Sequence, residues 1–585
     1  MRFGTHFSKV ALLVSSSCAI STSALALNAG ETVDNFRLID HRGDAQELYY
    51  RSDMKAVVLL THMNGCDGVR TSARSLEALR QKYQAQGVEF LMLNANLDNT
   101  REAIAADSKQ LALNAPIMID DSQLIAESLG IKTNGEVLVV TPQLGWKLAY
   151  RGAAAGASDA LDAVVAGKPV ANATTAASGC AVALPELAKR NAHAQISYEK
   201  TIAPILQEKC VACHREGGIG PWAMSSYDMI RGFSPMIREV VRTKRMPPWH
   251  ADPHYGTFSN DRGLSNAETK ALVHWIEAGA PRGTGADPLT TQKKDWPQWA
   301  LGEPDLVIAA PAFTTPKTGV IPYQNVKVKN PLKEDKWIRA IDYLPGQRAV
   351  LHHVIASVGG ERLGATSLNN YVPGAEPLVM PEGNGILLKA GETFHFQMHY
   401  TPNGQELTDV TRLGLYFMDA PPAHRFRSLI LAQPRLKIPA NTKFHPEKAV
   451  QTFKQDSVIY SLHPHAHFRG KSASFLAQYP DGREEMLINI PNYDFNWQAT
   501  YDLVKPITVP AGTKIVYTQT FDNSSQNKAN PDPNRTVTWG EQTWDEMVFG
   551  VVRYRNLVES GVEEKPTGPS QEELFSERPL RTSSR

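Results

Sequence analysis

The pattern of apolar and polar positions changes character along the chain. Short, continuously apolar runs at residues 56–60 and 88–93 predict buried parallel strands, and a further strand is expected at 137–140. Between the first two runs, residues 71–86 have helical spacing, with Leu76, Leu79 and Tyr83 on one face. Strands that alternate with helices are typical of an α/β fold. We therefore expect an α/β domain over residues 27–170.

Helical spacing returns after a stretch of small residues. Residues 153–177 are rich in Ala, Gly, Ser and Thr, which predicts the end of a helix and then a linker, placed at residues 171–195. Helices are expected at 198–209 and at 265–278, where Leu272 and Trp275 face a core. A small all-α domain is therefore expected over residues 196–290.

From about residue 296 the chain has short runs of strand character, broken by Pro, Gly and Asn clusters. The runs lie at 337–341, 393–400, 413–418, 458–468, 472–479 and 514–521. This pattern predicts two all-β, jelly-roll-like sandwiches, divided near residue 421 into residues 296–425 and 426–560. Residues 561–585 are charged and contain several prolines, so a flexible tail is expected.

Charge and the N-terminus restrict the class of protein. The 61 Lys and Arg residues nearly balance the 60 Asp and Glu residues, so no basic field predicts a nucleic-acid partner. Residues 1–26 contain Arg2 and Lys9, an apolar run and an Ala-x-Ala site, which is typical of a secretory signal peptide. No later run approaches the roughly 20 apolar residues of a membrane span. A periplasmic or secreted protein is expected.

The first α/β segment resembles the thioredoxin and peroxiredoxin-like redoxins, with Cys66 between the first strand and the helix. It departs from them because Val69 stands where a resolving cysteine would lie, and Gly135 stands in place of the usual proline. Dithiol exchange within one motif is therefore excluded. Two hypotheses remain: a docking or electron-relay domain in which Cys66 pairs with Cys180, as a structural or redox-active disulfide, and a domain with an active thiol.

The sequence Cys-Val-Ala-Cys-His at residues 210–214 is the most specific short motif in the chain. In such a motif Cys210 and Cys213 form thioethers to a haem and His214 is an axial ligand. The alternative is a zinc or redox Cys-x-x-Cys, but export favours a covalently bound haem c. The loop at 246–249, Met-Pro-Pro-Trp, resembles that of haem domains fused to exported enzymes. We expect Met246 to be the second axial ligand, with His250 as its rival.

Histidines gather in the all-β part of the chain. In an extended strand side chains alternate between faces, so His463, His465 and His467 are expected on one face. Imidazole suits copper, zinc, iron or nickel. A metal site is therefore predicted at residues 460–471, and a structural cluster of histidines is the alternative.

Four motifs follow in order: Leu-His-His-Val at 351–354, Gln-Met-His-Tyr at 397–400, His-Ala-His-Phe-Arg-Gly-Lys at 465–471, and Asp-Glu-Met at 545–547. Over residues 302–555 they resemble the type II copper, ascorbate-dependent monooxygenases, which include the peptide-amidating and dopamine β-hydroxylating enzymes. The resemblance implies two copper ions. The electron-storing copper would be bound by His352, His353 and His399. The oxygen-activating copper would be bound by His465, His467 and Met547.

Departures from this family limit the prediction of substrate. His463 stands where the peptide-amidating enzymes have a carboxylate-binding arginine, and Val551 stands where a tyrosine is expected, so their substrate specificity does not transfer. His463 is expected to lie beside the metal or to face substrate, and His395 to pack or to hydrogen-bond a ligand. Because His352 and His353 cannot share a face of a regular strand, a strand end or bulge is expected there.

Together these patterns predict a periplasmic copper monooxygenase that hydroxylates a C–H bond of a small molecule or peptide with O₂. Electrons would come from ascorbate or a redox protein, and the attached haem suggests a route for them. One alternative is a non-catalytic copper and haem protein for electron transfer or copper handling. A weaker alternative is a thiol peroxidase centred on Cys66.

Overall fold

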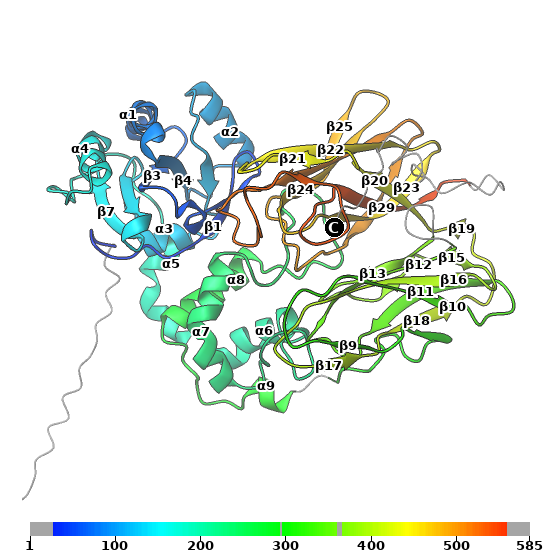
Figure 1. Cartoon of the computed structure of the whole chain (residues 1–585). Helices are drawn as coiled ribbons and strands as arrows, with labels where there is room; N and C mark the ends of the chain where they lie inside the picture. The colour runs from blue at the N-terminus through cyan, green and yellow to red at the C-terminus, as the bar shows by residue number, and fades with distance from the viewer. Residues whose placement is uncertain (1–26, 293–294, 360–365, 559–585) are drawn as a thin grey trace, which may run out of the picture.

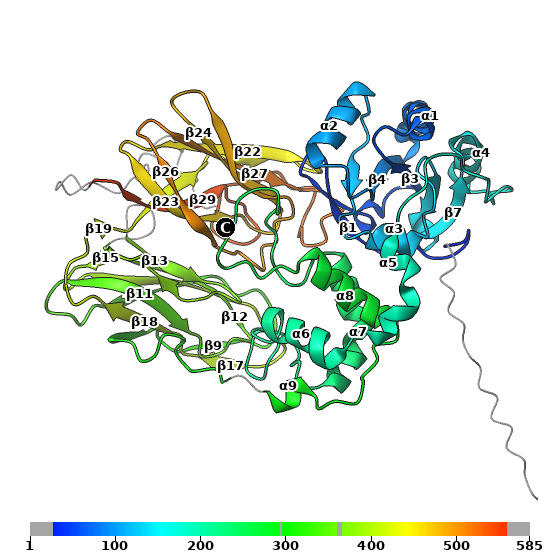
Figure 2. The same cartoon turned by 180° about the vertical axis from the view of Figure 1, so that it is seen from behind.

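The computed structural model describes residues 27–292, 295–359 and 366–558. The signal peptide predicted at 1–26 and the tail predicted at 561–585 lie outside the described residues. An α/β domain lies beside the last β region, and helices α6 to α9 lie between the α/β domain and the first β region (Figures 1 and 2). Within the described ranges, no helix combines the length and apolar character needed to cross a bilayer.

The N-terminal domain contains a seven-stranded sheet of order β2-β1-β5-β4-β3-β6-β7, in which β3 is parallel to β4 and antiparallel to β6. Alternate residues of β3 enter two separate apolar cores, one under α1 and α4 and the other under α3. The strands are β1 (Arg37–Asp40), β2 (Ala45–Glu47), β3 (Ala56–His62), β4 (Val88–Asn94), β5 (Ile117–Ile119), β6 (Val137–Thr141) and β7 (Lys147–Gly152). The helices are α1 (Asp67–Tyr83), α2 (Arg101–Gln110), α3 (Leu124–Leu129) and α4 (Ala154–Val165), with short turns η1 (Tyr49–Arg51), η2 (Gln84–Gln86) and η3 (Pro142–Leu144).

The predicted α/β alternation is confirmed. Both faces of β3 and β4 are buried, which explains why their sequences are continuous apolar runs. The following linker is folded against this domain. Bridges join Thr174 to Arg151 and Ala181 to Thr133, and two short helices follow, α5 (Pro185–Ala188) and η4 (Arg190–Gln195).

The helical domain has its own core around Trp275, whose side chain is fully buried. The helix expected at 198–209 forms as η5 (Tyr198–Ile202) continued by α6 (Ala203–Lys209), and it is followed by α7 (Tyr227–Arg242), α8 (Asn266–Glu277) and α9 (Pro288–Thr291). Ser265 and Glu268 form a capping box that starts α8. The expected helices are therefore confirmed.

The first β region has two principal sheets that face each other across one core. One has the order β10-β16-β12-β13, and the other has the order β19-β15-β11-β18-β8, with β14 beside β11 and a separate β17-β9 pair. The strands are β8 (Leu306–Ala309), β9 (Phe313–Thr315), β10 (Gln324–Lys329), β11 (Lys336–Leu344), β12 (Leu351–Val358), β13 (Thr366–Tyr371), β14 (Leu378–Val379), β15 (Asn384–Leu388), β16 (Thr393–Tyr400), β17 (Leu407–Asp409), β18 (Arg412–Phe417) and β19 (His424–Arg425).

The second β region has two sheets over one core, each with four antiparallel strands, in the orders β20-β29-β23-β26 and β22-β27-β24-β25. A β21-β28 pair lies beside them. The strands are β20 (Arg427–Ala432), β21 (Lys437–Ile438), β22 (His445–Thr452), β23 (Ser457–His465), β24 (Gly470–Gln478), β25 (Glu484–Ile490), β26 (Tyr501–Val509), β27 (Lys514–Phe521), β28 (Val537–Thr538) and β29 (Phe549–Asn556).

The predicted large all-β region is thus confirmed, and one local expectation is wrong. The strand expected at 458–468 ends at His465, so His467 lies beyond the strand and not on its regular alternation. A turn over residues 466–469 redirects the chain into β24 because the backbone N–H groups of His467 and Arg469 donate to the buried Glu546 carboxylate.

Polar contacts connect the N-terminal domain with the second β region. The Tyr50 hydroxyl donates to Asp522 at 2.6 Å, and Lys443 lies 2.8 Å from Asp53. These contacts place the sheet of the N-terminal domain beside the second β region, as both views show (Figures 1 and 2).

Candidate metal centre

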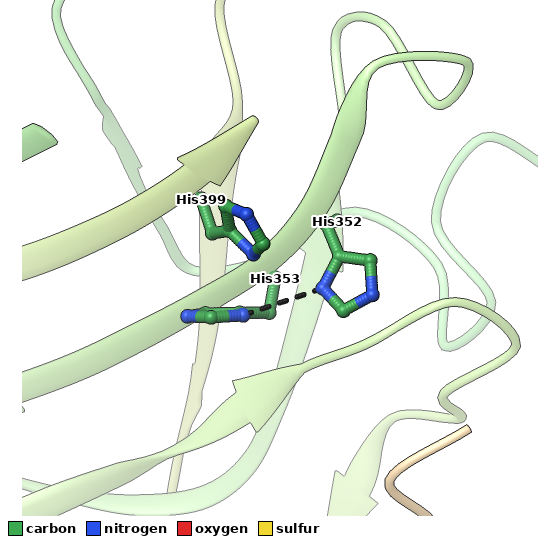
Figure 3. A group of neighbouring side chains, drawn as sticks. All are labelled: His352, His353 and His399. Carbon is green, nitrogen blue, oxygen red and sulfur yellow. Dashed lines mark hydrogen bonds between the residues drawn. The ribbon is translucent and has the colours of Figure 1, made fainter. Parts of the chain in front are cut away.

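Three histidines from two neighbouring strands form the first candidate centre (Figure 3). His353 of β12 is paired in register with His399 of β16, and both point away from the core that Val354 and Met398 enter. The register shifts between Leu351 and His353, which is the irregularity expected for two adjacent histidines. It brings His352 to the same group.

The nitrogens of this group are close together and poorly partnered. One ring nitrogen of each histidine lies within 4.8 Å of the other two, and Nδ1 of His352 lies 3.4 Å from Nδ1 of His353. Nε2 of His352, Nε2 of His353 and Nδ1 of His399 are buried without a hydrogen-bond partner among the described residues. Each such atom costs about 1–3 kcal/mol unless a ligand binds it.

Burial keeps these imidazoles neutral. It lowers the pKa of His352 to about 4 and the pKa of His399 to about 3, and it lowers the pKa of His353 well below its ordinary value. A neutral imidazole has a lone pair to offer, which is the form that binds a metal. The residues present therefore fit a soft or borderline metal such as copper.

The second predicted group has one free nitrogen on each imidazole. Nδ1 of His465 donates to Oε1 of Gln498, and Nδ1 of His467 lies 3.2 Å from the carbonyl oxygen of Asp545. Within the described residues Nδ1 is the hydrogen-bonded nitrogen of both rings, and Nε2 remains for a ligand, an arrangement usual for metal-binding histidines. The two rings are 5.1 Å apart and perpendicular. Burial lowers the pKa of both histidines, that of His465 to about 4.

Met547 follows Glu546, the buried carboxylate that binds the turn containing His467. Oε2 of Glu546 accepts the His467 N–H at 2.8 Å and Oε1 accepts the Arg469 N–H at 2.6 Å. Burial raises the pKa of Glu546 to about 8 although these N–H groups act in the opposite direction. The carboxyl group thereby holds the Met547 segment against the His467 turn.

Phe495 lies between the two histidine groups, and the sequence had not indicated it. Its ring stacks on His352 with centroids 4.8 Å apart and contacts His467 edge-on at 5.9 Å. The imidazoles of His352 and His467 are therefore at most 10.7 Å apart. The two groups belong to one site between the two β regions.

Other side chains of the site were also missed. The ring centroid of Tyr323 lies 5.2 Å from that of His353 and 4.8 Å from that of His399. The buried hydroxyl of Tyr323 has no hydrogen-bond partner among the described residues. Gln498 is held for His465 because its amide nitrogen donates to the Phe495 carbonyl at 3.1 Å. A tyrosine before a strand and a glutamine in a loop have no local pattern that predicts these roles.

The remaining predicted histidines have different surroundings. His463 is buried, its Nδ1 lies 3.2 Å from Thr500 Oγ1, and burial lowers its pKa to about 3. His395 lies on the His399 face of β16 but is only half-buried. Neither belongs to the close group formed by His352, His353 and His399.

The Cys-x-x-Cys-His motif begins at Cys210, directly after α6. Nδ1 of His214 lies 3.1 Å from the Trp222 carbonyl, which leaves Nε2 for a ligand. Burial raises the pKa of Cys210 to about 12 and also raises that of Cys213, which disfavours thiolate chemistry. Met246 follows α7 and donates its N–H to Val240 at 3.2 Å. Its pairing with His214 stays a prediction.

A cavity of about 330 Å³ lies between the helical domain and the two β regions. His463 and Gln498 line one part of it, and Trp497 and Arg262 line another. A Cβ atom on Gly374, also in the lining, would lie 3.6 Å from Cys213 Sγ and 3.7 Å from the Trp497 ring. The cavity therefore extends from Gly374, which lies beside Cys213, to Gln498, which orients His465.

Cys66 and Cys180, which are 114 positions apart in sequence, form a disulfide. The linker before Cys180 packs tightly against the region around Cys66: a Cβ on Gly68 would lie 2.7 Å from the Gly179 Cα. Asn134 also donates its N–H to the Cys180 carbonyl at 2.7 Å. The chain's own linker thus covers the face of the domain where Cys66 lies.

Comparison with known proteins identifies this domain. Residues 29–153 match the AhpC/TSA family, so the chain contains a redoxin domain with a thioredoxin-like fold. Similar solved structures include a hypothetical protein from Sinorhizobium meliloti, with 23% identity over 27% of this chain and 95% of that chain and a TM-score of 0.26. An uncharacterized conserved protein from Geobacillus kaustophilus has 21% identity over 27% of this chain and 93% of that chain, with a TM-score of 0.26. Peroxidoxin BcpB from Mycobacterium tuberculosis has 16% identity over 24% of this chain and 97% of that chain, with a TM-score of 0.22. No curated protein matches the chain.

Proposed function

We propose that this protein is an exported copper monooxygenase that hydroxylates a C–H bond of a small molecule or peptide. The observation that carries the proposal is the set of buried, unpartnered nitrogens on His352, His353 and His399. A second pair of imidazoles, on His465 and His467, lies across Phe495. Two such groups fit the two copper ions that the four sequence motifs imply.

Bound copper would supply one-electron chemistry and activation of O₂ at these residues. The balanced reaction takes R–H, O₂, two electrons and two protons to R–OH and water. It therefore needs an external reductant, either ascorbate or a redox protein. The chain's own contribution is to keep the imidazoles neutral, to orient them through Gln498 and Asp545, and to exclude water by burial.

The finer domain assignments are part of the same proposal. The strand orders of the second β region, four against four over one core, support a jelly-roll-like sandwich. The helices around the Cys-x-x-Cys-His motif support a cytochrome c-like domain in which Cys210, Cys213 and His214 hold a haem. Met246 is proposed as the other axial ligand.

A haem held by Cys210, Cys213 and His214 would supply electrons, and the residues between this motif and His465 suggest a route for them. Cys213 and Trp497 both lie beside Gly374, and Trp497 is followed by Gln498, which binds His465. This short connection needs no large movement of either domain. The cavity between them is the proposed place for substrate.

The test is oxygen uptake by copper-loaded, haem-containing protein that has been reduced without oxygen. We expect oxidation of the haem and O₂ consumption that rises when substrates from a metabolite mixture are added, with an oxygen-dependent mass gain. His467→Ala should abolish uptake, and His445→Ala, a half-buried histidine paired with Glu447, should not. Bound copper without uptake would instead support an electron-transfer or copper-handling protein.

A further inference from the structure

Residues 176–181 of the linker cross the face of the redoxin domain where Cys66 lies, and we call this segment the strap. The strap is anchored on its N-terminal side because Thr175 Oγ1 lies 2.7 Å from the Tyr150 hydroxyl. It is anchored on its C-terminal side because Val182 packs against the apolar core under α3. The strap is therefore a short segment held at each end.

Between its anchors the strap has little to hold it except the disulfide. Its sequence is Ala-Ala-Ser-Gly-Cys-Ala, and none of its six residues is buried. The Cys180 carbonyl accepts the Asn134 N–H at 2.7 Å, and Ala181 forms an isolated bridge with Thr133. Such small, exposed side chains bury little apolar surface, whereas ordering each residue costs conformational entropy. The covalent bond from Cys180 to Cys66 is therefore the main restraint on the strap.

Glycines let the strap lie directly on the face beneath it. A Cβ atom on Gly179 would lie 1.8 Å from the Asn134 carbonyl oxygen, so only glycine fits there. Gly135, which stands in place of the usual proline, has a φ of +91°, and a Cβ there would lie 3.3 Å from the Ser178 carbonyl oxygen. The closed strap and the face thus fit each other, and in this closed position Cys66 is only 2% exposed.

The surroundings of the disulfide favour its opening by an external thiolate. Cys66 is the N-cap residue of α1, a helix of 17 residues whose N-terminus stabilises a negative charge. The Cys180 N–H donates to Cys66 Sγ at 3.2 Å and would stabilise a thiolate there as well. Cys180 is only half-buried, so its sulfur is the one that an external thiolate reaches. Cys66 is therefore suited to be the leaving group.

We propose that the strap is a redox-controlled cover of Cys66 that an external dithiol opens. The first thiolate of the dithiol attacks Cys180 Sγ, the bond between Cys180 and Cys66 breaks, and Cys66 leaves as a thiolate. The second thiolate of the dithiol attacks the mixed disulfide, and Cys180 leaves. The dithiol becomes a disulfide, and its two electrons and two protons pass to the protein. The strap then lifts between its anchors and exposes the Cys66 thiol. This device is independent of the proposed copper chemistry.

The first test is hydrogen exchange in the full-length protein, oxidised, reduced with dithiothreitol, and as Cys180→Ser. The amide of Asn134 is expected to exchange at least about 10-fold faster in the reduced protein and in Cys180→Ser, because it loses the carbonyl of residue 180. The β3 amides should stay protected in all three, which shows that the domain remains folded. Ser178→Ala changes the strap and retains both cysteines, so its oxidised form should exchange like the oxidised wild type. Unchanged protection of Asn134 after reduction and in Cys180→Ser would overturn the proposal.

A second readout measures access to the sulfur of Cys66. In native Cys180→Ser, alkylation of Cys66 by a maleimide, located by peptide mapping, should proceed within about 10-fold of its rate in denaturant. Wild type reduced with dithiothreitol and freed of the reagent without oxygen should react at a similar rate. Alkylation that needs denaturant in both proteins would show that the strap stays closed without the disulfide, and would overturn the proposal.

Discussion

Nδ1 of His352 lies 3.4 Å from Nδ1 of His353, although neighbouring side chains of a regular strand point to opposite faces. The register shift at the start of β12 is what permits this contact. His352 is half-buried and His353 is buried. Between two neutral imidazoles, such a short separation suits two ligands of one metal ion as well as it suits a hydrogen bond. The relationship therefore predicts the first of four measurable outcomes.

Removing one imidazole of the first group should remove one copper ion. His353→Ala and His399→Ala are each expected to bind one copper equivalent fewer than the wild type, because two imidazoles do not complete the site. Metal analysis and electron paramagnetic resonance after dialysis against Cu²⁺ measure this. His445→Ala is the control, and an unchanged copper count in His353→Ala would exclude the site.

Gln498 should act through His465. Gln498→Leu removes the acceptor of the His465 Nδ1–H, so copper affinity at the second group is expected to fall about 10- to 100-fold while the first group is unaffected. Competition with a copper chelator measures the two affinities. Gln478→Leu, at a half-buried glutamine that contacts Glu484, is the matched control. Equal affinities in both variants would contradict an orienting role.

The disulfide should stabilise the redoxin domain. The double variant Cys66→Ser, Cys180→Ser is expected to lower the free energy of unfolding of this domain by about 2–4 kcal/mol, because the bridge closes a long loop. Hydrogen exchange of the β3 and β4 amides in the full chain, with and without reductant, measures the change. If reductant and the double variant leave the exchange unchanged, the bridge has no structural role. Peroxide reduction that requires Cys66 would instead support an active thiol.

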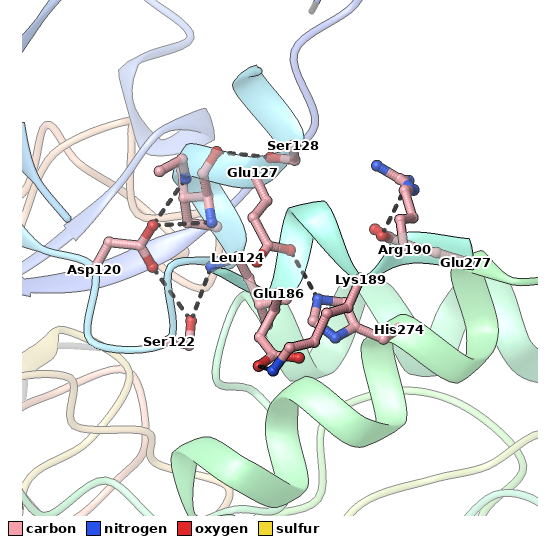
Figure 4. A network of polar contacts seen from close by, with 12 residues as sticks. Asp120, Ser122, Leu124, Glu127, Ser128, Glu186, Lys189, Arg190, His274 and Glu277 are labelled. Carbon is pink, nitrogen blue, oxygen red and sulfur yellow. Dashed lines mark hydrogen bonds and ion pairs between the residues drawn. The ribbon is translucent and has the colours of Figure 1, made fainter. Parts of the chain in front are cut away.

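Asp120 should make the redoxin domain less stable as pH rises. Its Oδ2 accepts the N–H groups of Ile125 and Ala126 at the start of α3, and burial raises its pKa from 3.8 to about 6 (Figure 4). The folded domain therefore binds this proton more tightly than the unfolded chain. The contribution to stability is complete below about pH 3.8 and is lost as pH rises through 6.

Asp120→Asn removes the charge and retains an oxygen for both N–H groups, while its amide can donate to Ser122. It is expected to stabilise α3 at pH 7 by about 1–3 kcal/mol and to remove the pH dependence between 4 and 6. Hydrogen exchange of the α3 amides from pH 4 to 8 tests this. A variant less stable than the wild type at pH 7 would show that the charge at the helix N-terminus is favourable.

Much of the local structure follows from the sequence because its signals are local. The apolar runs that became β3 and β4 are continuous because both faces of these strands are buried. The helix that begins after Ser265 has its capping partner Glu268 only three residues away. The motif that contains Cys210, Cys213 and His214 likewise lies within five consecutive residues.

What the sequence determined by itself is therefore the set of elements and the residue types capable of binding metals. Only the tertiary structure placed Phe495 between His352 and His467 and brought Glu127 to His274, 147 residues further along the chain. Periodicity and capping depend on neighbours within a few residues. Contacts between distant segments depend on how whole sheets and helices pack, and no local pattern records that packing.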